Sequence, residues 1–67
     1  MKNCLEELRQ AKSLSQADLG MALEVSRQTI ISLEKGRYNP SLTLAYRISR
    51  YFDRPIEDIF FDTEEEN

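Results

Sequence analysis

An arginine and a glutamine stand side by side directly after a serine, at the head of a stretch with helical periodicity. They are Arg27 and Gln28, and Ser26 before them is a preferred residue type for a helix N-cap. A guanidinium can donate two hydrogen bonds to guanine O6 and N7, and a glutamine amide can pair in the same way with adenine N6 and N7. In the first turn of a helix, this chemistry indicates base recognition in the major groove of DNA, and the plainer alternative is a solvated helix face.

The helix expected over residues 27–35 has two faces. Ile30 and Leu33 recur at the helical period and are predicted to pack into a core. Ile31 and Ser32 lie on the opposite face, where Ile31 either contacts a thymine methyl group or is partly covered by the loop that follows. The predicted base-reading residues are therefore Arg27, Gln28, Ile31 and Ser32.

A second short helix is expected just before this one, over residues 16–23. Ser15 is a natural N-cap, and Asp18 three residues later can complete a capping box. Gln16 then stands in the first turn, where its side chain and the free backbone N–H groups can approach a phosphate at the positive end of the helix. Two short helices joined by a tight turn predict a helix-turn-helix arrangement.

Polar residues around these two helices are predicted to contact the phosphate backbone. Such contacts fix the register of a protein on DNA but carry no base information. Solvated surface is the alternative for each residue, and Thr29 could simply pack at the edge of the core. The predicted phosphate contacts are Gln16, Ser26, Thr29, Lys35, Arg37, Tyr38 and Asn39.

This region resembles the helix-turn-helix of the Cro/cI-like repressors, also called the xenobiotic-response-element family. The shared pattern is a Gln that opens the first motif helix, a small residue four positions later, a serine cap on the second helix and inward-facing aliphatic residues after it. The resemblance extends from about residue 5 to residue 60. The residues that carry it are Gln16, Gly20, Val25, Ser26, Ile30, Leu33 and Asn39-Pro40-Ser41.

Two positions depart from the family pattern. The family usually has Ala at the position of Gly20, and Gly20 still allows two helices to approach closely at a cost of about 1 kcal/mol in helix propensity. The family usually has Gly at the position of Glu24. If the turn needs a left-handed backbone there, a residue with a Cβ adds about 1 kcal/mol of strain.

The resemblance implies an all-α fold, a compact five-helix bundle of the lambda-repressor-like DNA-binding type. Members bind two-fold operators as dimers, with half-sites about 34 Å apart. The resemblance further implies a partly buried ion pair between Arg9 and Glu34, which would hold the reading helix, over residues 27–35, against the first helix. The alternative is that these are two unrelated surface charges. The remaining helices are expected over residues 3–11, 42–52 and 56–60.

The formal net charge of −3 is unevenly distributed along the chain. Residues 1–50 hold eight Lys or Arg and five Asp or Glu, a net +3, whereas residues 51–67 hold one Arg and seven acidic residues, a net −6. The positive charge gathers in and just after the second motif helix, where phosphates would lie. We therefore expect one DNA-binding domain over residues 1–61 and a disordered acidic tail over residues 62–67.

The composition argues against several classes of protein. At 67 residues the chain has room for one small core and none for a separate small-molecule pocket. It has no histidine and a single cysteine, Cys4, so no metal, no cofactor and no internal disulfide are expected, and an enzyme is the weakest interpretation. The sequence has no long apolar run and no secretory leader, which predicts a cytoplasmic protein without membrane contact.

The C-terminal end of the domain has more apolar residues than a helix of one and a half turns needs. Some of them are predicted to form a homodimer interface, and the alternative is that all of them close the core of the monomer. The residues are Ile56, Ile59, Phe60 and Phe61.

We therefore predict a sequence-specific, homodimeric transcriptional regulator, a repressor whose helix over residues 26–35 enters the major groove of double-stranded DNA. Two alternatives remain open. One is a protein-interaction module that keeps the fold and uses its acidic C-terminal face, and the other is an antitoxin whose toxin-binding segment would be the tail. The basic face with Arg27 and Gln28 favours DNA, because a pure interaction module has no reason to keep it.

Overall fold

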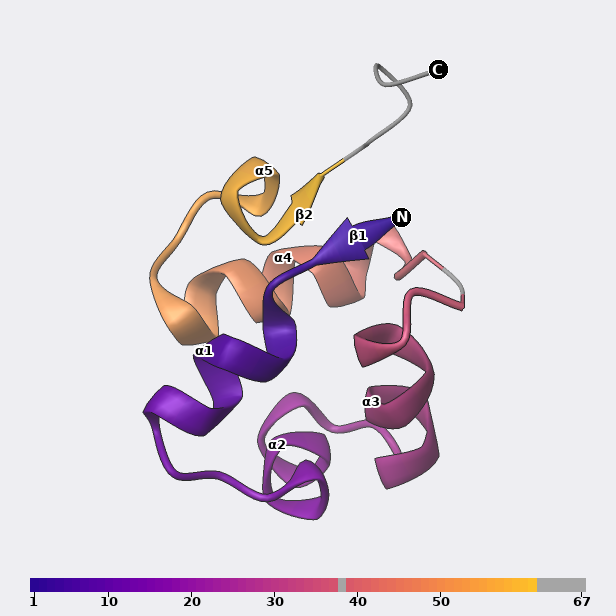
Figure 1. Ribbon diagram of the computed structural model, residues 1–67, viewed down its shortest axis with the longest axis vertical. Helices are drawn as coiled ribbons and strands as arrows, with labels where there is room; N and C mark the ends of the chain where they lie inside the picture. Colours follow the sequence, from indigo (N-terminus) through magenta and orange to yellow (C-terminus); the bar gives the residue numbers. More distant parts are fainter. Residues whose placement is uncertain (38, 62–67) are drawn as a thin grey trace.

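The computed structural model describes residues 1–37 and 39–61. In these residues five helices pack together, and a small two-stranded sheet joins the two ends of the chain (Figure 1). The elements are β1 Lys2–Asn3, α1 Leu5–Ala11, α2 Gln16–Leu23, α3 Arg27–Glu34, α4 Leu42–Phe52, α5 Ile56–Ile59 and β2 Phe60–Phe61. The predicted five-helix bundle is confirmed. The proposed disorder of residues 62–67 and the proposed role of Tyr38 lie outside the described residues.

Three serines fix where the central helices begin. Ser15, Ser26 and Ser41 each accept, through the side-chain oxygen, a hydrogen bond from the backbone N–H three residues later. At α2 the carboxylate of Asp18 also accepts from the backbone N–H of Ser15, which completes the predicted capping box. Such caps satisfy N–H groups that have no partner within the helix. They therefore set which residues stand in the first turns of α2 and α3.

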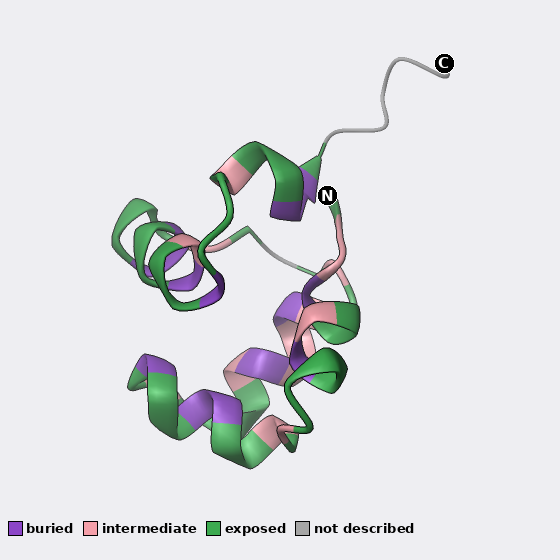
Figure 2. Cartoon of the chain, turned by 90° about the vertical axis from the view of Figure 1, so that its left-hand side faces the viewer, coloured by how far each residue is buried: buried purple, intermediate pink, exposed green. Residues whose placement is uncertain are grey.

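One hydrophobic core is shared by all five helices and β2. Buried residues face the space between the helices, and exposed residues cover the outside (Figure 2). The helix-turn-helix is held in this core because α2 and α3 each direct two large aliphatic side chains into it. The buried members are Leu5, Leu19, Leu23, Ile30, Leu33, Leu44, Ile48, Phe52, Ile59 and Phe60.

The sheet was not predicted, and it corrects the bounds of two helices. The strands are antiparallel and pair Lys2 with Phe61 and Asn3 with Phe60. The first helix therefore begins at Leu5 rather than at residue 3, and the last helix ends at Ile59 because Phe60 is extended, with φ −116° and ψ 126°. The backbone N–H of Cys4 also donates to the carbonyl oxygen of Ile59 at 3.0 Å. This pairing brings the N-terminus beside the end of the domain.

Cys4 has a structural place next to this sheet. It is half-buried at the start of α1, and its thiol donates to the carbonyl oxygen of Asp58 at 3.4 Å. Burial, followed by the carboxylate of Glu7, raises the pKa of the thiol above its ordinary value. The reactive thiolate form is therefore disfavoured at neutral pH.

The turn between α2 and α3 involves both departures from the family pattern, because Glu24 begins the turn and Gly20 lies in α2 directly beneath it. Glu24 ends α2 in the left-handed region, with φ 64° and ψ 39°. A Cβ added at Gly20 would lie 2.8 Å from the backbone oxygen of Val25, so the turn passes very closely over α2. Gly20 therefore serves a close approach, and Glu24 occupies the strained position that usually takes Gly.

Replacing Glu24 with Gly is expected to stabilise the domain by about 0.5–1 kcal/mol. The substitution removes left-handed strain of about 1–2 kcal/mol, and part of this gain is offset by the greater freedom of glycine in the unfolded chain. The Arg47–Glu24 ion pair that is lost has a 3.7 Å separation and is solvent-exposed, so it contributes little. The urea midpoint of unfolding measures the change. Glu24→Ala is the control, because it removes the same charge but keeps the strain, and an equal gain in both variants would contradict the strain argument.

No helix within the described ranges is long and apolar enough to cross a membrane. The longest of them, α4, has 11 residues, whereas a membrane span needs about 20.

Candidate nucleic-acid interface

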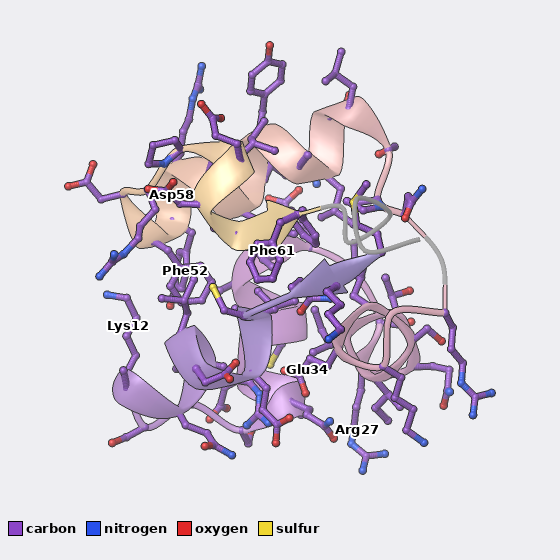
Figure 3. All side chains as sticks on the ribbon, turned by 45° about the horizontal axis from the view of Figure 1, so that its top comes forward. Lys12, Arg27, Glu34, Phe52, Asp58 and Phe61 are labelled. Atoms are coloured by element: carbon purple, nitrogen blue, oxygen red, sulfur yellow. The ribbon has the colours of Figure 1, made fainter. Side chains whose placement is uncertain are left out.

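The first turn of α3 carries the predicted base-reading pair. Ser26 caps the helix by accepting from the backbone N–H of Thr29 at 3.1 Å, and its hydroxyl also bonds the Thr29 hydroxyl at 3.0 Å. Arg27 and Gln28 follow the cap directly, and both are exposed. In Figure 3 Arg27 projects from the edge of the molecule into solvent. Two polar side chains with bidentate donor geometry therefore extend from the positive end of a helix.

The opposite face of α3 is fully buried. Ile30 and Leu33 are both 0% exposed, so α3 is held in the core along one side. Ile31 and Ser32 are partly buried beside them. Ile31 is thus partly covered and keeps some accessible surface. The helix consequently presents its exposed polar residues in a fixed orientation.

The end of α3 leads into a basic loop. Gly36 has a positive φ of 71°, and the backbone N–H of Arg37 donates to the carbonyl oxygen of Ser32 at 3.0 Å, which closes the helix. Lys35, Arg37 and Asn39 are all exposed. Their side chains therefore lie in solvent around the C-terminal end of α3.

Glu34 joins three elements of the site. Its carboxylate Oε2 accepts from Arg9 Nε at 2.6 Å, and its Oε1 accepts from Gln16 Nε2 at 3.1 Å. Arg9 also donates from Nη1 to the carbonyl oxygen of Leu14 at 2.8 Å. The hydrogen bond to Glu34 raises the pKa of the Arg9 guanidinium above its ordinary value, so Arg9 stays charged. This network ties α1, the start of α2 and the end of α3 together.

The predicted phosphate residues differ in how free their side chains are. The exposed Lys35, Arg37 and Asn39 lie around the end of α3. Ser26 and Thr29 are already engaged with each other in the cap, and Gln16 is half-buried with one amide N–H held by Glu34. Sequence reasoning identified Gln16 and Glu34 separately but did not connect them.

Two further positioning residues were missed. Asn3 donates from Nδ2 to the carbonyl oxygen of Leu33 at 2.8 Å, and Arg47 donates from Nη1 to the carbonyl oxygen of Leu23 at 3.2 Å. Each side chain donates to a carbonyl oxygen at the C-terminal end of a motif helix. Asn3 shares the Leu33 carbonyl oxygen of α3 with the backbone N–H of Gly36, and Arg47 contacts the Leu23 carbonyl oxygen of α2. The two side-chain contacts join positions that are far apart in the chain, so no local pattern indicates them.

The four predicted dimer residues have different surroundings. Ile59 and Phe60 are buried in the core of the monomer, with exposed fractions of 0% and 8%. Ile56 is half-buried, and Phe61 is 38% exposed. Little surface of Ile59 and Phe60 is therefore left for a second subunit, because the β1–β2 pairing closes the core around them.

Comparison with known proteins gives the family. A family model described as helix-turn-helix matches residues 5–59. The uncharacterized HTH-type transcriptional regulator MJ0272 of Methanocaldococcus jannaschii is 52% identical over 66 residues, which cover 98% of this chain and 100% of that protein. The uncharacterized HTH-type transcriptional regulator YgzD of Bacillus subtilis is 48% identical over 67 residues, which cover 100% of both chains.

A solved structure agrees with this assignment. The restriction-modification controller protein C.AhdI from Aeromonas hydrophila superposes with a TM-score of 0.73 at 32% sequence identity, covering 84% of this chain and 85% of that one. The family consists of DNA-binding regulators rather than enzymes. The chain belongs to the Cro/cI-like family of helix-turn-helix transcriptional regulators.

Proposed function

We propose that this protein is a transcriptional repressor that binds a short two-fold operator as a homodimer, with α3 in the major groove. The observation that carries the proposal is the geometry of α3. Arg27 and Gln28 are exposed in its first turn, while Ile30 and Leu33 on its other side are fully buried. Side chains with bidentate geometry on a rigidly held helix are what direct readout of base edges requires.

The surroundings of α3 suit the DNA backbone. Lys35 and Arg37 give positive charge beyond its C-terminal end, and Gln16 stands at the capped start of α2. Contacts from both ends would set the register of α3 in the groove, while bases are read between them. We assign Ser26, Thr29, Tyr38 and Asn39 to the same backbone role, and Ile31 and Ser32 to the bases. On a promoter the dimer would occlude the polymerase, and its proposed place of action is the cytoplasm.

The proposed dimer interface combines an apolar hollow lined by Met1, Leu42 and Ile56 with the exposed side chain of Phe61. Met1 is 51% exposed and Leu42 is 68% exposed, and both line a hollow of about 330 Å³ with Ile56. Phe61 directly follows Phe60, which lines the hollow, and its side chain is 38% exposed at the end of β2. An apolar surface of this kind is unusual on a small domain unless a partner covers it. A second copy on this patch would give the two-fold symmetry that a palindromic operator needs.

Phe61→Asp is expected to weaken self-association at least tenfold while leaving the monomer folded. The side chain of Phe61 is partly exposed at the edge of the two-stranded sheet, and burying a carboxylate in an apolar interface is unfavourable. Sedimentation equilibrium measures the dimer, and circular dichroism reports the fold. Met21→Asp is the matched control, because Met21 is 79% exposed on α2, which lies at the opposite end of the ribbon from α5 and β2 (Figure 1). Loss of the native spectrum in Phe61→Asp alone would instead place Phe61 in the monomer core.

The proposed function is tested by selection from randomised duplex DNA. The purified protein and the Arg27→Ala/Gln28→Ala variant are each incubated with the pool, and the retained duplexes are sequenced. We expect the natural protein to enrich a two-fold motif and the variant to lose it. If neither protein enriched a sequence and both bound only weakly and in a salt-sensitive way, the repressor proposal would be overturned.

A further inference from the structure

The carboxylate of Glu34 is shared between two partners. Arg9 donates to it from Nε at 2.6 Å and from Nη2 at 3.3 Å, and Gln16 donates from Nε2 at 3.1 Å. The side chain of Glu34 is 5% exposed, so these hydrogen bonds lie in a poorly solvated site. A structural ion pair needs only Arg9. The hydrogen bond from Gln16 is an additional contact, which supplies a further donor to the buried carboxylate and joins the start of α2 to the pair.

This contact determines which groups of Gln16 remain free. A glutamine amide has two N–H bonds and one carbonyl oxygen in a plane. Because one N–H is held by Glu34, rotation of the plane is restricted and the second N–H is left for another acceptor. Gln16 is the first residue of α2, and the Ser15 cap holds the backbone there. Both the backbone and the side chain of Gln16 are therefore ordered before any ligand binds.

We propose that Glu34 is a positioning residue for DNA binding, which orients the Gln16 amide so that its second N–H can donate to a phosphate. This inference rests on the proposed function. Ordering a long side chain in advance removes an entropy cost that binding would otherwise include. The buried pair of Arg9 and Glu34 then contributes to DNA affinity through Gln16, in addition to holding α1 against α3.

Replacing both members of the ion pair separates the positioning of Gln16 from the effect of net charge on DNA binding. Arg9→Met/Glu34→Met removes one positive and one negative charge, so the net charge that DNA meets is unchanged. Buried ion pairs are commonly replaced by apolar side chains of similar volume without loss of the fold. The variant therefore removes the acceptor of Gln16 while preserving the electrostatic attraction to phosphates. Replacing Glu34 alone would leave the Arg9 charge unpaired and would confuse the two effects.

The experiment is a double-mutant cycle that measures affinity for the duplex selected above. The natural protein, Gln16→Ala, Arg9→Met/Glu34→Met and the combined triple variant are titrated under conditions where circular dichroism shows each to be folded. We expect the pair replacement to weaken binding about twofold to tenfold when Gln16 is present, the range for immobilising one long side chain. In the Gln16→Ala background, the same pair replacement should change the dissociation constant for the duplex less than twofold.

A second cycle gives the matched control. Lys35 is exposed next to Glu34 in sequence, and its side chain makes no hydrogen bond to the Glu34 carboxylate among the described residues. The pair replacement should therefore weaken the Lys35→Ala variant by the same factor as the natural protein. Equal weakening in the presence and in the absence of Gln16 would mean that the pair acts by holding α3 alone, and it would overturn the positioning role.

A measurement without DNA distinguishes failure of the inference from failure of the proposed function. In the free protein, the side-chain amide proton of Gln16 that Glu34 accepts should exchange with solvent more slowly than the amide protons of the exposed Gln28 side chain, and the pair replacement should remove this difference. Equal exchange of the two side chains in the natural protein would overturn the inference even if DNA binding is strong. Absence of any operator for the natural protein would overturn both proposals.

Discussion

Arg9→Met is expected to lower the free energy of unfolding by about 3–5 kcal/mol. The substitution leaves the Glu34 carboxylate buried without its cation, at a site where the two side chains are 11% and 5% exposed. It also removes a donor to the carbonyl oxygen of Leu14. Small domains are stable by only about 5–15 kcal/mol, so the variant should be close to unfolding at 37 °C. Urea denaturation followed by circular dichroism measures the loss.

Two comparisons isolate the buried charge as the cause. Arg9→Met/Glu34→Met should recover most of the stability, because no uncompensated charge remains. Glu24→Gln is the surface control, since the Arg47–Glu24 pair is separated by 3.7 Å, its side chains are 46% and 77% exposed, and this variant keeps the hydrogen bond from Arg47 to the Leu23 carbonyl oxygen. It should cost no more than about 1 kcal/mol. Equal losses for Arg9→Met and Glu24→Gln would contradict a buried ion pair in solution.

Arg27→Ala/Gln28→Ala is expected to reduce discrimination between the operator and an unrelated duplex by about 30-fold to 10⁴-fold. Each bidentate contact with a base contributes about 1–3 kcal/mol of discrimination, and the two contacts are lost together. Because both side chains are exposed, the urea midpoint of unfolding should stay within error of the natural protein. Fluorescence anisotropy titrations on the two duplexes give the ratio of dissociation constants.

Lys35→Ala is the control for this experiment. An exposed lysine beyond the reading helix should weaken binding to both duplexes by a similar factor and should reduce the slope of log K against log salt by about 1. The discrimination ratio should therefore stay unchanged. If Arg27→Ala/Gln28→Ala also weakened both duplexes equally, these two residues would contact phosphates and base reading would have to be assigned elsewhere.

Features of the fold that depend on neighbouring residues were predictable from the sequence. Ser15, Ser26 and Ser41 begin helices at the predicted positions, because each serine caps the helix that directly follows it. The sequence also predicted backbone strain at Glu24 if the turn needs a left-handed conformation there, and the backbone of Glu24 does adopt that conformation. Such effects act within a few residues, so residue type and spacing are sufficient to predict them.

Contacts between distant parts of the chain were not predictable in the same way. Strands of two residues have no periodic pattern, and the pairing of Lys2 with Phe61 joins the two ends of the domain. That pairing is why Phe60 belongs to the core and not to a helix. The inward direction of Asn3 and Arg47, each toward a helix carbonyl group, was missed for the same reason.

The sequence by itself determined which residues could read DNA and on which helix they stand, since the serine cap and the helical period place Arg27 and Gln28 opposite Ile30 and Leu33. Only the tertiary structure decided how that helix is held. Glu34 meets both Arg9 and Gln16 because α1, α2 and α3 converge there, and Phe61 keeps accessible surface because Ile59 and Phe60 fill the core. The physical reason is that caps and periods act between neighbours in the chain, whereas burial and shared hydrogen bonds depend on how the helices pack in space.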